Sequence, residues 1–267
     1  MTTEKTWLAH DDACARSEAM YLDPDTGFMV FTELGLRARE RCCGSGCRHC
    51  PFHHEGVALQ QRGQRIQRAA LLCGALEEHL PYDVLCWSGG KASYICWQTL
   101  NRVATRPIVL ITAFDAQQRH LPTQQIHIRD VIGQANALGV PLVGVPIHAG
   151  RAENSQLEEG LNLIPKRVRL VSGDINANAD VATNPFCTLV SWLGEPHSMT
   201  RPLEGLDTDA LHSALEDSEL TYTITAAPLK PSLVGKSYSR ACVESYNRDA
   251  SAASTDKIHT FAELTRR

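Results

Sequence analysis

The chain has 267 residues, of which 43% are hydrophobic and 21% charged, and its formal net charge is −4. These values are typical of a soluble globular protein with room for one large domain and an appendage. The negative charge excludes a global field that would attract nucleic acid, and no apolar run is long enough to cross a bilayer. The first residues, Met1 to Lys5, do not resemble a signal peptide, so we expect a cytoplasmic protein with no membrane partner.

The N-terminal part is predicted to hold a short strand and a metal site. A turn rich in Asp, Pro and Gly at residues 23–27 leads into the strand, over residues 28–31. Four of the ten cysteines then lie within nine positions: Cys42, Cys43, Cys47 and Cys50. Because cytosolic thiols stay reduced, this run predicts a bound metal rather than disulfides.

The spacing of these cysteines bears on the identity of the metal. Cys43, Cys47 and Cys50 are separated by three and then two residues, which suits an iron–sulfur cluster better than Zn²⁺, whose sites usually take two separated pairs of ligands. Cys42 is either a fourth ligand or a neighbour that does not ligate. Three histidines are either alternative nitrogen ligands or exposed polar groups: His49, His53 and His54.

Residues 28–33 and 42–52 carry a resemblance to a known domain. Through the sequences FMVFTE and CCGSGCRHCPF, the segment from about Tyr21 to His54 resembles a small, uncharacterised cysteine-rich domain of bacterial proteins. That resemblance implies no function. The cysteine spacing is also similar to that of radical enzymes that cleave S-adenosylmethionine, but the long alternation of strands and helices that a barrel needs does not follow.

A helix is predicted between the cysteines and the first main strand. Its apolar face has helical spacing and consists of Ile66, Ala69, Ala70, Cys73, Leu76 and Leu80. This helix would separate two domains. The predicted organisation is a cysteine-rich metal-binding domain at 1–56, a connecting helix at 57–81, an α/β domain at 82–240 and a C-terminal tail at 241–267.

A glycine-rich loop at residues 88–93 is the most informative feature of the sequence. The apolar strand Val84–Cys86 runs into it, and apolar residues at helical spacing follow it. Two glycines and a serine at the start of a helix expose several backbone N–H groups at the positive end of the helix dipole, which together form an anion site. Lys91 adds a positive charge, and Ser88 and Ser93 add hydroxyl donors.

Neither common nucleotide motif has this spacing. A Walker A loop needs G-x-x-x-x-G-K-[ST], and a dinucleotide fingerprint needs G-x-G-x-x-G. The alternative without a ligand is a simple Gly-Gly turn between a buried strand and a helix.

Beyond the loop, strands and helices alternate. Strands are predicted at 108–115, 142–147 and 168–175, and a helix over 128–138 that ends at Gly139. This pattern predicts an α/β fold with a doubly wound parallel sheet. Ligands of such sheets bind beyond the carboxyl ends of the strands, where the glycine loop, Asp115 and Asp174 would converge. Each acid alone is more often an ordinary turn or cap residue, but together with the glycine loop they predict a site for Mg²⁺.

The glycine loop and several later segments resemble those of a known family. The loop Ser88-Gly89-Gly90-Lys91-Ala92-Ser93 is similar to the S-G-G-K-D-S loop of PP-loop ATP pyrophosphatases, members of the adenine nucleotide alpha hydrolase superfamily with a Rossmann-like (HUP) fold, and the chain looks most like the diphthine ammonia ligase group. The resemblance covers roughly residues 82–240. Further matching segments lie at 112–115, 134–142, 173–175, 201–203 and 233–236.

The resemblance implies a reaction with ATP and Mg²⁺. In this family, a substrate carboxylate or carbonyl oxygen attacks the α-phosphorus, pyrophosphate leaves, and ammonia or another nucleophile displaces AMP. Carried over to this chain, catalysis falls to Lys91 and Asp174. Binding of ATP falls to Ser88, Gly89, Gly90, Lys91, Ser93 and Asp115.

Two departures from the family pattern leave three hypotheses open. Ala92 replaces the acid of the loop, and residues 176–185 lack the His, Arg and Glu side chains of the bacterial relatives. The first hypothesis is an ATP-dependent adenylating ligase with an unidentified carbonyl or carboxylate substrate. The second is sulfur transfer to a tRNA, a protein or a small molecule, assisted by an iron–sulfur cluster. The third is a nucleotide-binding protein without catalysis, because an alanine cannot ligate Mg²⁺.

Overall fold

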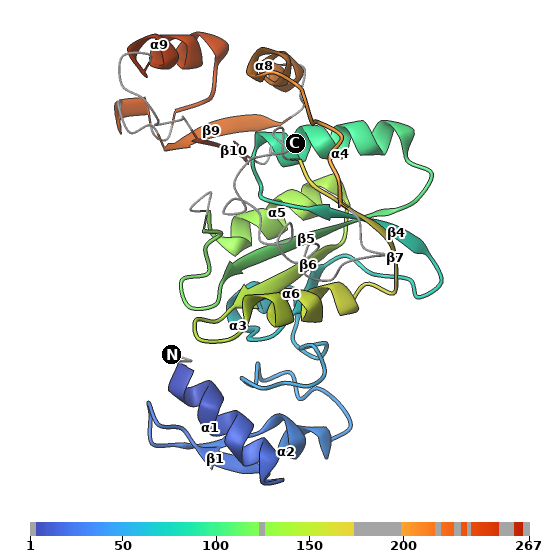
Figure 1. The fold of residues 1–267 in the computed structure, drawn as a ribbon, viewed down its shortest axis with the longest axis vertical. Coiled ribbons are helices and arrows are strands. Elements are labelled where there is room, and N and C mark those ends of the chain that lie inside the picture. Colours follow the sequence, from blue (N-terminus) through green and yellow to red (C-terminus); the bar gives the residue numbers. More distant parts are fainter. Residues whose placement is uncertain are drawn as a thin grey trace.

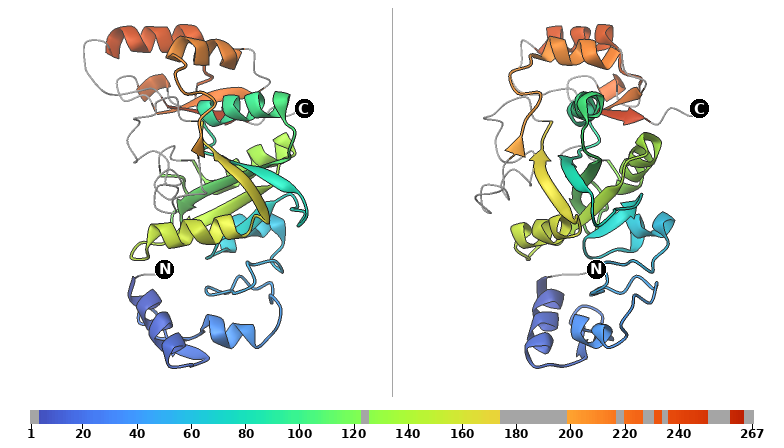
Figure 2. Two further views of the ribbon diagram at one scale, coloured as in Figure 1. Left: turned by 45° about the vertical axis from the view of Figure 1, so that its right-hand side comes forward. Right: turned by 90° about the vertical axis from the view of Figure 1, so that its right-hand side faces the viewer.

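A computed structural model gives the arrangement of the chain in three parts. The structure describes residues 4–122, 126–173, 199–216, 220–226, 231–233, 236–250 and 259–263. A small N-terminal region lies at one end, a sheet flanked by helices lies in the middle, and a smaller C-terminal part lies at the other end (Figures 1 and 2). Among the described helices, none is long and apolar enough to cross a membrane.

The N-terminal region combines two helices with a hairpin. Its elements are α1 (Glu4–Ala15), β1 (Met20–Leu22), β2 (Met29–Phe31) and α2 (Glu33–Arg37). The strand predicted at 28–31 is confirmed as β2, and it pairs antiparallel with β1 so that Tyr21 lies opposite Val30. Thr32 ends the hairpin and begins α2, because its side-chain oxygen accepts a hydrogen bond from the Gly35 backbone N–H at 3.1 Å.

The middle part is an α/β domain built on one six-stranded sheet. The spatial strand order is β3-β6-β5-β4-β7-β8. Strand β3 is antiparallel to its neighbour, and the other four pairings are parallel. The strands are β3 (Ala70–Cys73), β4 (Pro81–Cys86), β5 (Ile108–Asp115), β6 (Leu142–Ile147), β7 (Lys166–Val171) and β8 (Met199–Thr200).

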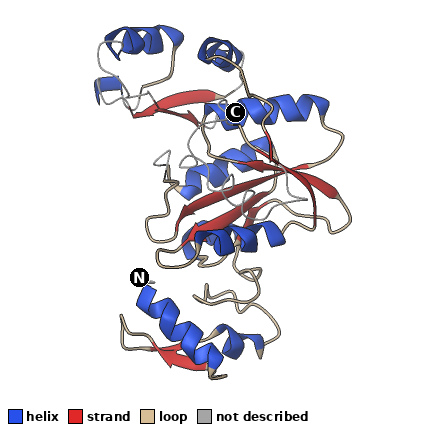
Figure 3. Ribbon diagram, viewed as in Figure 1, coloured by secondary structure: helices blue, strands red, loops and turns tan. Residues whose placement is uncertain are grey.

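Helices cover both faces of this sheet, as Figure 3 shows. They are α3 (Leu59–Arg65), α4 (Lys91–Val103), α5 (Ile128–Leu138) and α6 (Glu153–Asn162). The apolar sides of α4 and α5 pack on one face, against residues such as Leu85 and Leu110. Leu157 and Leu161 of α6 pack on the other face, against Val84 and its neighbours. Because helices bury both faces of the sheet, its strands are continuous apolar runs in the sequence. The predicted α/β fold class is therefore confirmed.

The boundaries of the central elements agree with the sequence pattern. The predicted strands at 108–115 and 142–147 and the helix at 128–138 have the observed limits. Gly139 ends the helix in the left-handed conformation, at φ 66°, and its N–H bonds back to the Ala135 carbonyl. Glycine adopts this conformation without a steric penalty, which explains why the helix stops there.

The predicted helix over 66–80 is wrong. Helix α3 ends at Arg65, Ile66 is extended, and residues 70–73 form β3. Ala70 pairs with Gly144, and a Cβ on Gly144 would lie 2.3 Å from Leu72, so the bare glycine makes room for that side chain. Apolar residues at helical spacing also contain the continuous run 69–73, and pairing with the sheet edge selects the strand. The sheet therefore begins within the predicted connector at 57–81.

The C-terminal part is also more than a tail. Its elements are α8 (Thr208–Glu216), β9 (Thr221–Ala226), the 3₁₀ turn η1 (Pro231–Leu233), α9 (Arg240–Ala250) and β10 (His259–Glu263). Strand β10 pairs antiparallel with β9, and both α8 and β10 contact α4. Ile224, Val243 and Tyr246 form a small core of their own. The last residues of the described chain thus return to the α4 side of the α/β domain.

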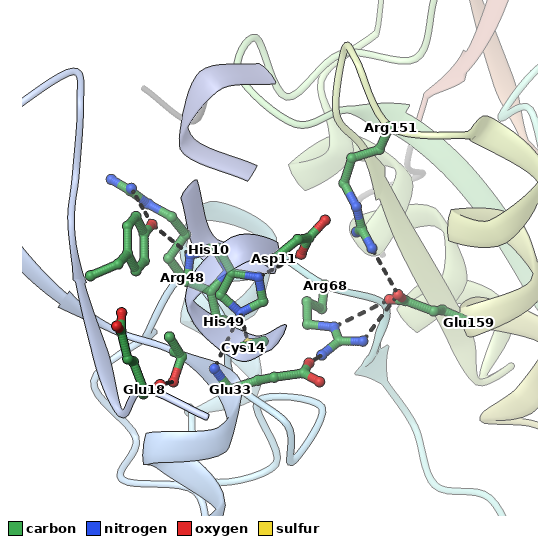
Figure 4. Close-up of polar contacts among 12 residues, drawn as sticks. His10, Asp11, Cys14, Glu18, Glu33, Arg48, His49, Arg68, Arg151 and Glu159 are labelled. Atoms are coloured by element: carbon green, nitrogen blue, oxygen red, sulfur yellow. Dashed lines mark hydrogen bonds and ion pairs between the residues drawn. The ribbon is translucent and has the colours of Figure 1, made fainter. Parts of the chain in front are cut away.

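An arginine joins the N-terminal region to the α/β domain (Figure 4). Arg68 contacts Glu33 of α2 at 2.5 Å and Glu159 of α6 through two nitrogens, at 3.0 and 3.3 Å. Arg151 reaches the same Glu159 at 3.5 Å, and its guanidinium lies 4.2 Å from the ring centre of Trp7 on α1. Charge-assisted contacts of this kind have defined geometry, so the two parts are held in one orientation.

Candidate nucleotide loop and cysteine pocket

The glycine loop lies between β4 and α4 at the carboxyl edge of the sheet. Gly89 has φ 73°, a conformation that favours glycine, and Gly90 is the N-cap of α4 without any side-chain cap. Helix α4 begins at Lys91, which is half-buried. The predicted strand, loop and helix are therefore confirmed in order and position. The backbone N–H groups of the first turn face the edge where ligands of parallel sheets bind.

The loop hydroxyls form a closed set of hydrogen bonds. Ser88 donates to the Ser93 oxygen at 3.2 Å, and Ser93 donates to the Gly90 carbonyl at 2.9 Å. The Gly90 N–H points back to the Ser88 oxygen at 3.4 Å. Each of these bonds joins residues at most five positions apart, so together they hold the loop in one compact conformation.

Gln134 supports the loop from α5, and sequence reasoning gave it no role. Its side chain is fully buried, accepts a hydrogen bond from Trp87 Nε1 at 2.9 Å and donates to the Gly89 carbonyl at 3.0 Å. The available signal was a glutamine on the apolar face of the predicted helix, between Val131 and Ala135. A buried amide needs partners, and here the loop supplies them.

The end of β7 lies against the same helix turn. A Cβ on Gly173 would come within 2.8 Å of the Ala92 carbonyl oxygen and 3.0 Å of the Ser93 nitrogen. The Ala92 side chain packs against the apolar core beside α4. Strand β7 thus delivers the chain directly to the glycine loop. Asp174, predicted as catalytic, lies outside the described residues, as do residues 176–185.

Asp115 ends β5, as predicted, but its carboxylate has a local role. One of its oxygens accepts hydrogen bonds from the backbone N–H groups of Gln117 and Gln118, at 2.8 and 2.5 Å. This is the turn-capping arrangement typical of aspartate after a strand. Cofactor binding by Asp115 stays a prediction.

Two histidines at the same edge were missed by sequence reasoning. His120 follows the turn after β5 and His127 precedes α5, and their rings lie edge to face with centroids 5.2 Å apart. His120 Nδ1 contacts the Gln118 carbonyl at 2.7 Å, and His127 Nδ1 accepts from the Arg129 N–H at 3.0 Å. Burial, followed by the charge of His120, lowers the pKa of His127. Both rings are therefore fixed through Nδ1.

The four clustered cysteines line one pocket in the N-terminal region. They form two close pairs, with 3.2 Å between the sulfurs of Cys43 and Cys47 and 3.7 Å between those of Cys42 and Cys50. The remaining lining residues are Leu36, Arg39, Arg41, Pro51 and Phe52. Within the described ranges, however, no three His, Cys, Asp or Glu side chains are arranged as a ready metal site.

The environments of the thiols differ. A hydrogen bond from the Ser45 backbone, and next one from Cys47, lowers the pKa of the Cys43 thiol to about 7. Burial, and next the hydrogen bond to Cys43, raises the pKa of Cys47 to about 11. Burial also raises the pKa of Cys50. Cys43 is therefore the thiol that loses its proton most readily, and thiolates are the form that ligates metals.

The three neighbouring histidines do not line this pocket. His49 is buried, bonds through Nε2 to the Tyr21 hydroxyl at 2.8 Å and stacks on His10 at 3.9 Å. His54 is buried too, and its Nε2 accepts from the Gln67 N–H at 3.2 Å. His53 is exposed. Burial lowers the pKa of His49 to about 2 and that of His54 to about 4, so both rings are neutral near pH 7.

Residues 9–56 match a family of unknown function, DUF5522. This segment runs from α1 through the four cysteines, and it includes the segment predicted to resemble an uncharacterised cysteine-rich domain. The family description carries no activity, and the match leaves the α/β domain outside it.

Proposed function

We propose that the α/β domain binds ATP at the loop 88–93 and cleaves it to AMP and pyrophosphate while it adenylates a carbonyl or carboxylate substrate. One observation supports this most: a glycine loop, braced by its own hydroxyls, precedes a helix at the carboxyl edge of the central strand β4. Backbone N–H groups at such a helix start bind phosphate well. A half-buried Lys91 would balance the phosphate charge.

The proposed chemistry depends on positioning. A substrate oxygen forms a bond to the α-phosphorus, the bond to the bridging oxygen breaks, and pyrophosphate leaves with that electron pair. Loop N–H groups and Lys91 would stabilise the charge that develops on the phosphate oxygens. His120 follows β5 and His127 precedes α5 at the same edge of the sheet. A substrate bound beside the loop would therefore contact these two histidines.

A second candidate is ATP binding without turnover, and two observations favour it. Ala92 offers no carboxylate where the similar loops carry an acid, and the Asp115 carboxylate already caps its own turn. Mg²⁺ prefers carboxylate ligands. In this case ATP would bind, but no AMP would form.

Titration calorimetry with MgATP, followed by chromatography for AMP, tests both candidates. We expect binding by the wild-type chain and at least tenfold weaker binding by Lys91→Ala. Lys166→Ala is the matched control, because Lys166 begins β7 at the opposite end of the strands. Equal binding by all three proteins would reject the nucleotide site. Binding without AMP, together with AMP formation by Ala92→Asp, would favour the second candidate.

We further propose that the four cysteines hold a metal. In a tetrahedral site with Zn–S bonds of 2.3 Å, neighbouring sulfurs lie about 3.8 Å apart. The separation of 3.7 Å between Cys42 and Cys50 is close to that value, the 3.2 Å between Cys43 and Cys47 is shorter, and a single-ion site would require the two pairs to move together. The sequence spacing favours an iron–sulfur cluster instead. Arg39 and Arg41 beside the pocket would balance the negative charge of four thiolates in either case.

Metal analysis of anaerobically purified protein separates these possibilities. About one zinc per chain, lost in Cys47→Ser and kept in Cys242→Ser, is expected for a single ion. Iron with visible absorption that disappears in the same variant would identify a cluster. Protein that contains neither metal, and binds neither when reconstituted, would reject the proposal.

A further inference from the structure

The outer face of the β1–β2 hairpin is apolar and exposed. In the antiparallel register, Met20 lies opposite Phe31 and Leu22 opposite Met29, so these four side chains share one face. Leu22 is 61% exposed and Met29 57%. The other face carries the buried Tyr21, next to α1. A hairpin with one buried face normally has polar residues on the other, so this face indicates a binding surface.

The backbone at the edge of β2 is also open. Hydrogen bonds from Asp23 N–H to Phe28 and from Thr32 N–H to Ala19 flank the ladder. Because hydrogen-bonded and non-bonded pairs alternate in an antiparallel ladder, Met29 and Phe31 occupy non-bonded positions. Their N–H and C=O groups point away from β1. Among the described residues, no backbone group pairs with them, so β2 presents an edge to which a further strand can add.

Two arginines give this surface a charge. The Arg39 guanidinium lies 4.7 Å from the ring centre of Phe31, and Arg41 follows two residues later. Neither makes an ion pair in the part of the chain that the structure describes. Two carboxylates of the N-terminal region are already engaged, Glu33 with Arg68 and Asp23 with Arg48. The arginines are therefore available to an acidic partner.

We propose that this surface, defined as the outer face of residues 20–22 and 29–31 with the edge of β2 and Arg39, binds an extended segment of a partner protein in which apolar and acidic residues alternate. The segment adds as a third strand to β2. Its apolar side chains cover Leu22, Met29 and Phe31, and a carboxylate meets Arg39. Met side chains adapt to differently shaped partners, which suits such a site.

Area and charge argue against a second copy of this chain. The exposed side chains of this face, Leu22, Met29 and Phe31, form a patch smaller than the roughly 800 Å² that each partner in a stable dimer buries. Pairing of β2 with its own copy would also bring two Arg39 side chains together. A nucleic acid fits less well, because this surface is mainly apolar around Arg39, whereas nucleic-acid surfaces carry several basic side chains.

The location links this surface to the cysteine pocket. Arg39 stacks on Phe31 and also lines the pocket, together with Leu36. A segment bound along β2 would therefore end beside the four thiols. Binding of the segment to the hairpin and Arg39 does not require a metal in the pocket.

Selection from a displayed library of random twelve-residue peptides tests the proposal with the full chain. The library is first passed over the variant Met29→Pro, which removes peptides that bind elsewhere on the chain. The remaining peptides are then selected on the wild-type protein. Proline at this position removes the outward N–H and the Met29 side chain but no bond of the hairpin ladder, so strand addition is blocked while the hairpin is kept. We expect enriched peptides that alternate apolar residues with Asp or Glu. By fluorescence anisotropy, they should bind at least tenfold more weakly to Leu22→Ser/Met29→Ser.

The charge is tested with Arg39→Glu, which should prefer versions of the same peptides in which Lys replaces the acids. Circular dichroism that matches the wild type shows that each variant is folded. No enrichment, or enriched peptides that lack the alternation of apolar and acidic residues, would overturn the proposal. A dimer in light scattering that Met29→Pro dissociates would instead identify a second copy as the occupant. Binding of single-stranded oligouridine, lost in the same variants, would identify a nucleic acid.

Discussion

Gln134 donates a hydrogen bond to the Gly89 carbonyl at 3.0 Å, so a helix on one face of the sheet holds the glycine loop at its edge. The same side chain accepts the Trp87 indole N–H. Because all of these groups are buried, the loop conformation depends on a residue that never needs to touch a ligand.

Gln134→Ala is expected to lower the free energy of unfolding by about 2–4 kcal/mol. The substitution leaves the Trp87 N–H and the Gly89 carbonyl buried without a partner, and each such group costs about 1–3 kcal/mol. Urea unfolding, followed by tryptophan fluorescence, measures the change. Gln61→Ala on the exposed side of α3 is the control and should have little effect. A loss below 0.5 kcal/mol would show that the loop does not need this support.

Gly173→Ala should disturb the first turn of α4. The new Cβ would lie 2.8 Å from the Ala92 carbonyl oxygen, so backbone must move, at a cost of about 1–3 kcal/mol. ATP binding at the loop should weaken along with thermal stability. Gly63→Ala is the matched control, since the nearest atom there is the end of the flexible Ile132 side chain. Equal melting temperatures for the two variants would contradict this prediction.

Arg68→Met should loosen the N-terminal region from the α/β domain. Arg68 is 18% exposed and holds Glu33 and Glu159, so its removal leaves these carboxylates with only the longer contacts to Arg37 and Arg151 and costs about 2–3 kcal/mol. Calorimetry should then show a lower or split transition. Arg129→Met, which removes an exposed pair with Asp130, should leave the transition in place. A single unshifted transition in Arg68→Met would mean that apolar contacts alone hold the junction.

The stability of the protein should decrease as the pH falls from about 6.5 to 4. His148 is buried and donates through Nε2 to the Gln67 carbonyl at 2.8 Å, and burial lowers its pKa to about 4. In that window the unfolded chain binds a proton that the folded chain does not. Folding therefore loses about 1.4 kcal/mol for each pH unit, or roughly 3 kcal/mol in all.

Unfolding free energies measured between pH 4 and 8 test whether stability decreases on acidification. His148→Phe should have a shallower pH dependence than the wild type, whereas His79→Phe, at a site 74% exposed, should not. Stability that increases on acidification in the wild type, or slopes that are identical in all three proteins, would show that His148 is charged in the folded state.

The sequence predicted the elements whose signals are local. The strand at 108–115 is a continuous apolar run, and the helix at 128–138 ends at a glycine that the structure finds in the left-handed conformation. The glycine loop is placed by the strand before it and the helix after it. Each of these signals lies within about a dozen residues, so no partner from elsewhere in the chain is needed to read it.

Elements that depend on distant partners were not predictable in this way. Residues 70–73 have spacing that suits a helix, and they become a strand because β6 offers an edge with Gly144 opposite Ala70, where the missing Cβ leaves room for Leu72. Strand β10 likewise exists only because it pairs with β9. The position of Asp115 at the sheet edge was predictable, but the hydrogen bonds that its carboxylate accepts from the following turn were not.

By itself, the sequence determined the α/β fold class, the position of the glycine loop and the presence of four cysteines close together, since all three follow from composition and spacing along the chain. Only the tertiary structure decided that Gln134 braces the loop, that the thiols form two pairs beside Arg39, and that Arg68 joins the N-terminal region to α6. These are contacts between segments far apart in the chain, and their energies come from burial and charge that exist only once the chain has folded.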